Sequence, residues 1–180
     1  MLNDYTVERA TAAQIAALPA IERAAAKRFR GWNVPDAIMR EATPSSVLQA
    51  ARAAELLWVA LDRGGDPVGF VYVNAAPRRV HLQELDVHPD HGRRGIGTTL
   101  FRAVERWAIA SGRREITLTT FRDVPWNAPF YETLGFELVA PTDLDAELKE
   151  RLDAEAERGL DPARRVAMRM RLRRPTSASS

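Results

Sequence analysis

Residues Val80–Ala110, VHLQELDVHPDHGRRGIGTTLFRAVERWAIA, carry the pattern that decides the predicted fold. Val80–Val87 alternates apolar and polar residues and then becomes mixed, which indicates a strand. The HPD tripeptide at 88–90 ends the strand, because proline has no N–H for a ladder and restricts the residue before it. From Gly97 onward apolar residues recur every three or four positions, which predicts an amphipathic helix. The stretch therefore reads as strand, turn and helix.

The turn Gly92–Gly97, GRRGIG, has the composition of an anion-binding loop. Its glycines let the backbone approach a ligand closely, and the first helical amides have no intrahelical acceptor. The helix dipole and two arginines add positive charge, so a phosphate or pyrophosphate would fit. A turn with glycine for geometry and arginine for solvation is the alternative. No Gly-Lys-Ser/Thr follows, and the glycine order is the reverse of a dinucleotide fingerprint.

The rest of the chain predicts one domain built from strands and helices. Strands are expected at 5–9, 56–61, 67–74, 80–87, 115–120, 136–139 and 162–174. Helices are expected at 11–28 with a break at Pro19, at 37–40, 45–54, 97–110, 127–134 and 143–158, the third capped by Ser45 or Thr43. The strand at 115–120 follows a helix, so it should run parallel to the strand at 80–87. In the last strand an arginine row alternates with apolar residues, which predicts a solvated edge protected by charge.

A second motif is Asn127–Phe136, NAPFYETLGF, which predicts a short helix stopped by Gly135. By itself Tyr131 could be an ordinary core aromatic. Together, LDVHP at 85–89, RRGIG at 93–97 and this second motif resemble the GNAT superfamily of acetyl-CoA-dependent N-acetyltransferases. The family's loop reads Gln/Arg-x-x-Gly-x-Gly/Ala, and Gly92 here replaces the first residue. The resemblance extends from Tyr5 to about Leu172.

The resemblance implies an α/β (α+β) GNAT fold. Its central mixed sheet has six to seven strands, helices cover both faces, and the parallel central strands splay apart. It further implies a single domain at 1–174. The polar composition of residues 175–180 predicts a disordered tail.

Acetyl-CoA is the cosubstrate that the resemblance implies. Backbone groups near Leu85 and Val87 would pair with its pantetheine arm, and the Val87 amide would polarise the thioester carbonyl. Asn127 matches the family's CoA-contacting asparagine. The pyrophosphate would lie against the remaining predicted ligands, which are Arg93, Arg94, Gly95, Ile96, Gly97 and Thr98.

Two catalytic residues are predicted. Glu84 is the first candidate for the general base that removes a proton from the acceptor amine, with His81, Gln83 and Asp86 as competitors. Glu84 could instead be a structural ion-pair partner. Tyr131 matches the family's general acid for the departing thiolate. The resemblance implies direct attack in a ternary complex, with no covalent enzyme intermediate.

Composition limits the other functions. The chain has no cysteine and a net charge of +2, so it has neither a thiol nucleophile nor a dominant basic block. His88 and His91 lack a third ligand, so we expect no metal. No signal peptide or membrane span is visible, and a cytoplasmic protein without membrane or nucleic-acid partners is expected.

The acceptor is expected to be a primary amine on a small molecule or a protein, bound near residues 24–54 with Phe29, Trp32 and Trp58. A homodimer is expected by analogy with the family. Two alternatives remain: a non-catalytic acyl-CoA-binding regulatory module, and nucleic-acid binding through the C-terminal arginine row.

Overall fold

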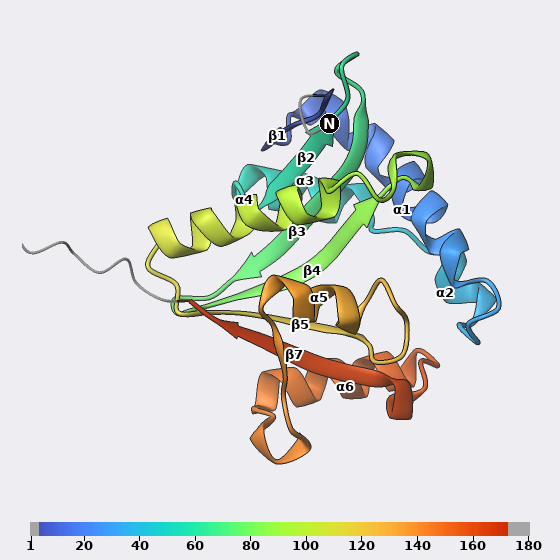
Figure 1. The fold of residues 1–180 in the computed structure, drawn as a ribbon, viewed down its shortest axis with the longest axis vertical. Helices are drawn as coiled ribbons and strands as arrows, with labels where there is room; N and C mark the ends of the chain where they lie inside the picture. The colour runs from blue at the N-terminus through green and yellow to red at the C-terminus, as the bar shows by residue number, and fades with distance from the viewer. Residues whose placement is uncertain (1–3, 173–180) are drawn as a thin grey trace, which may run out of the picture.

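A seven-stranded mixed sheet with helices on both faces forms the part of the chain, residues 4–172, that the computed structural model describes (Figure 1). The strand order is β1-β2-β3-β4-β5-β7-β6. The strands are β1 (Thr6–Arg9), β2 (Leu57–Leu61), β3 (Pro67–Ala75), β4 (Arg79–Val87), β5 (Glu115–Phe121), β6 (Glu137–Leu138) and β7 (Arg165–Arg171). The α-helices are α1 (Leu18–Ala26), α2 (Asp36–Arg40), α3 (Ser45–Ala53), α4 (Ile96–Ala110), α5 (Ala128–Leu134) and α6 (Ala146–Glu157).

The two central parallel strands, β4 and β5, are hydrogen-bonded to each other over only part of their length. β4 and β5 pair in parallel at Arg79–Glu115, Val80–Ile116 and His81–Thr117, and no further pair follows. Beyond that point β5 remains paired with β7 along its length, while β4 remains paired with β3. The two strands therefore diverge toward their C-terminal ends, which confirms the predicted splay and α/β class.

An irregularity in β4 decides which side chains face which side of the sheet. Tyr72 of β3 pairs with Glu84, but its neighbour Val73 pairs with Leu82, so Gln83 is an extra residue in β4. Such a bulge reverses the inward and outward alternation beyond it. Leu82 before the bulge and Leu85 after it consequently share one face, and Glu84 is turned to the other.

Each face of the sheet has its own core. One core, which lies under α4 and α5, contains Leu100, Phe101 and Leu134 together with Leu118 of β5 and Met168 of β7. The second core lies under α1 and α3 and includes Leu18, Leu48 and Phe70. Because α1 covers β3 and β4, it is placed over the face to which the bulge turns Glu84.

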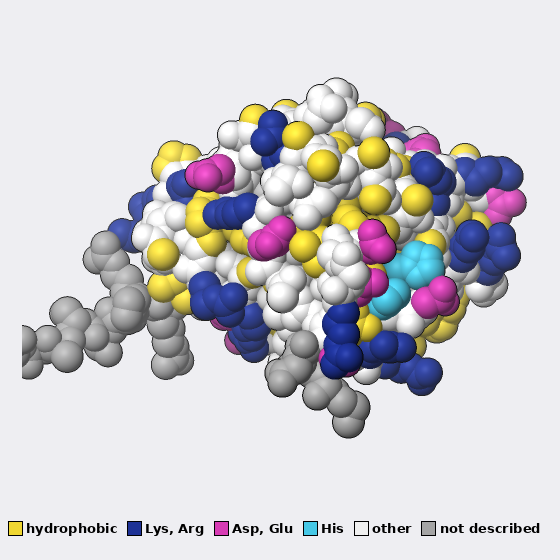
Figure 2. Space-filling view, turned by 90° about the horizontal axis from the view of Figure 1, so that it is seen from above, with side chains coloured by type: hydrophobic (Ala, Val, Ile, Leu, Met, Phe, Trp, Pro, Cys, Tyr) yellow, Lys and Arg dark blue, Asp and Glu magenta, His cyan; other side chains and the backbone are white. Residues whose placement is uncertain are grey.

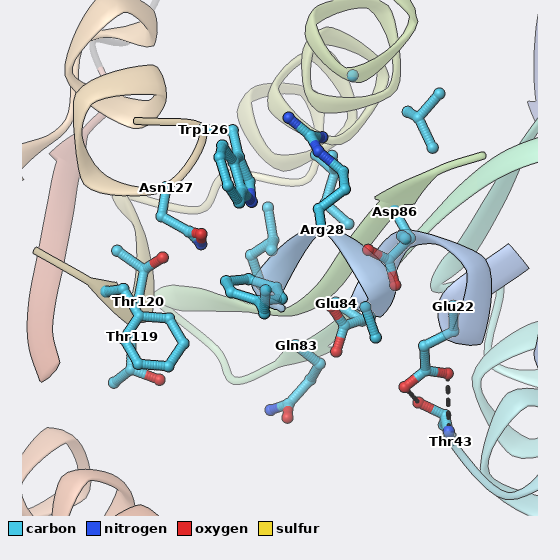
Figure 3. A pocket seen from close by; sticks show the side chains of 18 of the residues that line it. Glu22, Arg28, Thr43, Gln83, Glu84, Asp86, Thr119, Thr120, Trp126 and Asn127 are labelled. Atoms are coloured by element: carbon cyan, nitrogen blue, oxygen red, sulfur yellow. Dashed lines mark hydrogen bonds between the residues drawn. The ribbon is translucent and has the colours of Figure 1, made fainter. Parts of the chain in front are cut away.

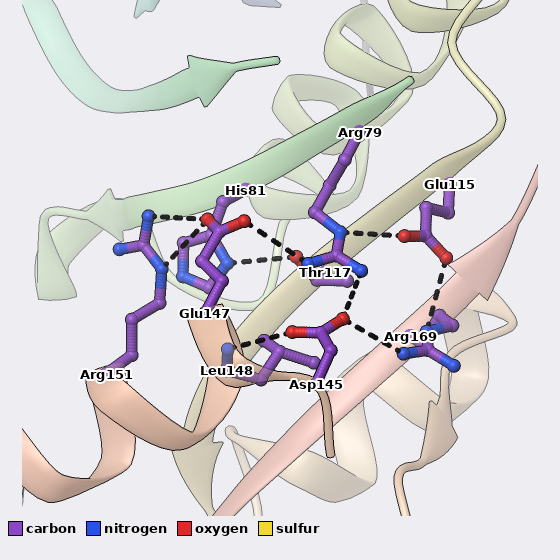
Figure 4. Close-up of polar contacts among 9 residues, drawn as sticks. All are labelled: Arg79, His81, Glu115, Thr117, Asp145, Glu147, Leu148, Arg151 and Arg169. Carbon is purple, nitrogen blue, oxygen red and sulfur yellow. Dashed lines mark hydrogen bonds and ion pairs between the residues drawn. The ribbon is translucent and has the colours of Figure 1, made fainter. Parts of the chain in front are cut away.

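Ion pairs attach α6 to the sheet (Figure 4). Arg79 Nε donates to Glu115 at 2.7 Å, and its terminal nitrogens pair with Asp145 and Glu147. Arg169 of β7 pairs with Glu115 at 3.2 Å and with Asp145 at 3.6 Å. Hydrogen bonds to Arg79 lower the pKa of Asp145. Charges on the strands are thus matched by acids on the helix that covers them.

This arrangement corrects the prediction for the last strand. β7 lies between β5 and β6, so it is not an edge. Arg165, at 10% side-chain exposure, pairs with Glu155 of α6 at 2.8 Å, and Arg169 pairs with Asp145, the N-cap of α6. Arg171 is exposed, and Arg173 lies outside the described residues. The alternation of polar and apolar residues within one strand cannot show that an acidic helix covers the polar face of that strand. On the face shown in Figure 2, acidic and basic side chains are interspersed.

Other boundaries also differ from the prediction. β7 begins at Arg165, because 162–164 form a 3₁₀ turn, and α6 begins at Ala146 after an Asp145 cap. The strand predicted at 136–139 has only two residues. Neither Ser45 nor Thr43 caps α3, which follows Pro44; Thr43 instead hydrogen-bonds Glu22.

The predicted tail at 175–180 lies outside the described residues, and the boundary at 174 stays a prediction. Within residues 4–172, no helix combines the length and apolar character needed to cross a membrane.

Candidate active site

The opening between β4 and β5 is the centre of the candidate site. Past His81 and Thr117, each strand has one edge that pairs with no strand among residues 4–172. Unpaired backbone N–H and C=O groups require another partner. A cavity of about 920 Å³ lies along this opening. Its walls come from α1, from residues 38–47, from β4 and the loop after it, from the end of β5, and from α5 and α6.

The loop after β4 places the start of α4 at one end of the cavity. Gly95 precedes the helix with φ +80°, a left-handed conformation that favours glycine. A Cβ on Gly97 would lie 3.4 Å from Leu85 Cδ2 and 3.6 Å from Phe130 Cζ, so α4 begins close against β4. The amides of the first helical turn have no intrahelical acceptor and lie at the positive end of the helix dipole.

Three carboxylates converge on the α1 side of the cavity (Figure 3). Glu22 from α1 and Glu84 and Asp86 from β4 each place an oxygen within 4.8 Å of the other two. Glu22 is held by Thr43, whose backbone N–H donates at 2.7 Å and whose hydroxyl donates at 3.2 Å. No described side chain forms a hydrogen bond or ion pair with Glu84 or Asp86, so these carboxylates remain available to a ligand.

The proximity of the carboxylates changes their protonation. Burial, followed by the negative charge of Glu22, raises the pKa of Glu84 to about 8, against the opposing charge of Arg165. Burial and then the charges of Glu84 and Glu22 raise the pKa of Asp86 well above its usual range. Burial also raises the pKa of Glu22, although the Thr43 hydrogen bonds oppose the shift. Near neutral pH the cluster therefore retains protons unless a cation enters it.

Tyr131 and Asn127 lie on the α5 side of the same cavity. Tyr131 is 8% exposed, and its hydroxyl forms no hydrogen bond with the described residues. Burial, and then the charges of Glu84 and Asp86, raise the pKa of Tyr131, so the phenol keeps its proton. The side-chain oxygen of Asn127 is buried without a partner among the described residues.

His81 also borders the cavity but carries no charge. Its Nδ1 lies 2.9 Å from Thr117 Oγ1, and the residue is 4% exposed. Burial and then the positive charges of Arg151 and Arg79 lower the pKa of His81 to about 3. A group with such a pKa is a weak base at neutral pH, which disfavours His81 as the proton acceptor.

Comparison with known proteins identifies the family. The model of the acetyltransferase (GNAT) family matches residues 20–136. This chain belongs to the GNAT family. A curated relative, an uncharacterised N-acetyltransferase of Methanocaldococcus jannaschii, is 38% identical in an 80-residue alignment that covers 41% of this GNAT chain and 35% of the relative. The match therefore spans about a third of the length of that relative.

Solved structures share the GNAT fold at low identity. The PaiA N-acetyltransferase of Thermoplasma acidophilum, in complex with coenzyme A, has a TM-score of 0.71 and 17% identity over 93% of this chain and 98% of its own. The ribosomal-protein-S18-alanine N-acetyltransferase of Escherichia coli has a TM-score of 0.66 and 13% identity over 98% and 99%. N-acetylglutamate synthase of Neisseria gonorrhoeae, complexed with coenzyme A and N-acetyl-glutamate, has a TM-score of 0.69 and 13% identity over 94% and 35%.

The GNAT fold brings nearly all of the predicted site residues to one cavity. Its lining includes Glu84, Leu85, Val87, Arg93, Gly95, Ile96, Gly97, Thr98, Asn127 and Tyr131. Arg94 is the exception: its guanidinium donates to the Tyr5 hydroxyl at 2.8 Å and to the Asp90 carbonyl at 3.3 Å. The Arg94 side chain thus ties the loop to the N-terminal segment, and its predicted role as a cofactor ligand would rest on the backbone.

Sequence reasoning did not anticipate some parts of the GNAT site. Glu22 was not predicted, and Trp58 was wrongly expected near the acceptor, since it packs in the α4 core against Trp107. Phe29 and Trp126 line the cavity, and Trp32 packs against Trp126 at 5.4 Å between ring centroids. Among residues 4–172, Glu22, Glu84 and Asp86 are the one group of three that could hold a metal, and it includes neither His88 nor His91.

Proposed function

We propose that this chain transfers the acetyl group of acetyl-CoA to a primary amine by direct attack in a ternary complex. The observation that carries the proposal is the opening between β4 and β5, which joins an anion-binding turn at one end to a carboxylate cluster at the other. The turn before α4 and the unpaired edge of β4 together fit an extended ligand that carries phosphate groups. The CoA-bound relatives described above support the same donor.

The residues present fit acetyl-CoA. The unpaired edge of β4 near Leu85 and Val87 can hydrogen-bond an amide-containing arm as a strand would. The turn at Gly95 and the first amides of α4 suit a pyrophosphate, and Arg93 adds positive charge. Asn127 has an amide oxygen without a partner in the described structure. Bound acetyl-CoA would supply the activated acetyl group.

We assign the general base to Glu84. An amine with a pKa near 10 arrives mostly as the ammonium ion, so a proton must leave before nitrogen can attack. The raised pKa of Glu84, about 8, lies closer to that of the amine than an ordinary carboxylate pKa does. The ammonium would give one proton to Glu84, and the neutral nitrogen would then bond to the acetyl carbon. The carbon–sulfur electron pair would leave with sulfur, and the remaining extra proton on nitrogen would pass to that thiolate, which gives the amide and the free thiol of CoA.

We assign to Tyr131 the hydrogen bond that stabilises the departing sulfur. Thiols have a pKa near 8.5, well below the raised pKa of this phenol. Complete proton transfer from Tyr131 to the sulfur would therefore be uphill, and a strong hydrogen bond is the favourable interaction. The proposed role is a positioned donor at the atom where negative charge develops.

Steady-state turnover tests this proposal. The full chain, given acetyl-CoA and a panel of small primary amines, should release free CoA and form the N-acetylated amine in equal amounts. Double-reciprocal plots at varied acetyl-CoA and amine should intersect, because both substrates bind before chemistry. Parallel lines would contradict direct attack. CoA binding without turnover of any amine would favour the alternative, a regulatory module that binds acyl-CoA.

A further inference from the structure

We propose that Glu22, Glu84 and Asp86 form a subsite for the ammonium groups of the acceptor, which selects an aliphatic diamine or polyamine over a monoamine. This inference rests on the proposed function, since it names the acceptor class of the same site. The distal ammonium lies among Glu22, Asp86 and one oxygen of Glu84, and the reacting amine lies between the second oxygen of Glu84 and Tyr131.

The separation of the three carboxylates matches an ammonium ion. One oxygen of each residue lies within 4.8 Å of the others. A nitrogen at the centre of such a triangle is at most about 2.8 Å from each oxygen, the length of a charge-assisted N–H···O bond. A primary ammonium has three N–H donors, one for each carboxylate. The cluster can therefore bind one ammonium with every donor satisfied.

The other polar group of the cavity also lacks a partner. Tyr131 is more than nine-tenths buried, and its hydroxyl, which faces the same cavity, bonds to none of the described residues. Tyr131 comes from α5 rather than from α1 or β4, so a separate element places it near the acids, and the charges of Glu84 and Asp86 raise its pKa. A buried hydroxyl and two carboxylates without side-chain partners in the described structure surround one cavity, which indicates a polar ligand between them.

The charges around the cluster favour a second positive charge on that ligand. Arg28 lies near Asp86, and Arg165 and Arg158 lie near Glu84, but none forms an ion pair with these acids. Three clustered carboxylates raise one another's pKa when no cation is present. A dicationic acceptor compensates the cluster and leaves Glu84 ionised, whereas an acceptor carboxylate would add repulsion.

Apolar surface lies beside the acids. Residues on either side of Thr43 in the sequence line the cavity with aliphatic side chains, namely Ile38, Met39 and Val47. This surface suits the methylene chain between two amines. Glu22 already accepts two hydrogen bonds from Thr43, which leaves it better suited to share an ammonium than to surround a metal ion.

Three acceptors of equal chain length test the subsite: putrescine, butylamine and γ-aminobutyrate, whose distal groups are cationic, neutral and anionic. With saturating acetyl-CoA, kcat/KM for putrescine should exceed that for butylamine by about 10- to 100-fold, because charged hydrogen bonds contribute on that order. γ-Aminobutyrate should be the poorest acceptor. Glu22→Gln and Asp86→Asn should each reduce the putrescine preference below about threefold. Glu150→Gln, at an exposed residue of α6 outside the cavity, should retain it.

Equal rates for putrescine and butylamine, or a preference that survives Glu22→Gln and Asp86→Asn, would overturn the subsite while leaving acetyl transfer intact. Calorimetric binding of Ca²⁺ or Mg²⁺ alone, lost in Glu22→Gln and without any effect of the distal charge on rates, would overturn it in favour of a metal site. If acetyl-CoA binds but none of the three amines is acetylated, the transfer reaction itself fails, and the subsite with it.

Discussion

Replacement of Glu84 by glutamine is expected to lower kcat by about 100- to 10,000-fold, the usual contribution of a positioned general base. Glutamine keeps the size and shape of the side chain but accepts no proton. The KM for acetyl-CoA should change little, since Glu84 belongs to the acceptor end of the cavity. Glu150→Gln is the matched control and should retain normal rates.

The pH dependence should identify Glu84 as the titrating group. Its pKa is raised to about 8, and the base acts only when deprotonated. For the free enzyme, kcat/KM should therefore increase with pH and level off above an apparent pKa near 8. Charged or titratable groups surround Glu84 from every neighbouring element, namely Glu22, Tyr72, Asp86, Tyr131, Arg158 and Arg165. A profile that keeps the same limb in Glu84→Gln would assign the base elsewhere.

Unfolding measurements distinguish a loss of kcat in Glu84→Gln from a folding defect in that variant. The folded protein binds the Glu84 proton more tightly than the unfolded chain, because the pKa is raised from 4.5 to about 8. The free energy of unfolding therefore decreases as pH rises through that window. Glu84→Gln removes this contribution, so the variant should be at least as stable as the wild type at pH 8. A large loss of stability would leave the kinetic defect uninformative about the base and would contradict the assigned electrostatics.

Tyr131→Phe is expected to lower kcat by about 10- to 1,000-fold, because it removes a hydrogen-bond donor aimed at developing negative charge. Phenylalanine preserves the packing of Tyr131 against Phe136 and Phe130, so the fold should persist. The defect should shrink with thioester donors whose thiol has a lower pKa, since their sulfur needs less stabilisation. A defect independent of the leaving thiol would indicate that Tyr131 supports only packing or acceptor binding.

The strand, turn and helix that position the donor end could be predicted from sequence because each signal is local. The bulge in β4 also left a local signal: the apolar phase shifts from Val80 and Leu82 to Leu85 and Val87. The mixed pattern at 84–87 is this phase shift, but the bulge was not predicted from it. A change of phase within one strand indicates an inserted residue, and here it determines which side chains reach the cavity.

Glu22 could not be found in the same way. Its helix was predicted, but the crossing of α1 over β4 is set by tertiary packing in the core that α1 and α3 cover. In sequence, Glu22 is one acid among many, 62 positions before Glu84. The prediction that the arginines of β7 face solvent was wrong for a related reason. Arg165 pairs with Glu155 of α6, and the alternation within one strand does not show which helix packs on it.

Acetyl-CoA binding is the most direct test of the account, and calorimetry on three proteins measures it. The wild type should bind with micromolar affinity. Gly95→Glu places a carboxylate in the proposed pyrophosphate turn and should weaken binding by more than about 100-fold, on the order of 3 kcal/mol. Gly112→Glu is the matched control: it has the same charge and a similar left-handed φ, +72° against +80°, just past the opposite end of α4. It should bind as the wild type does. No binding by the wild type, or equal binding by all three proteins, would contradict the proposed donor site.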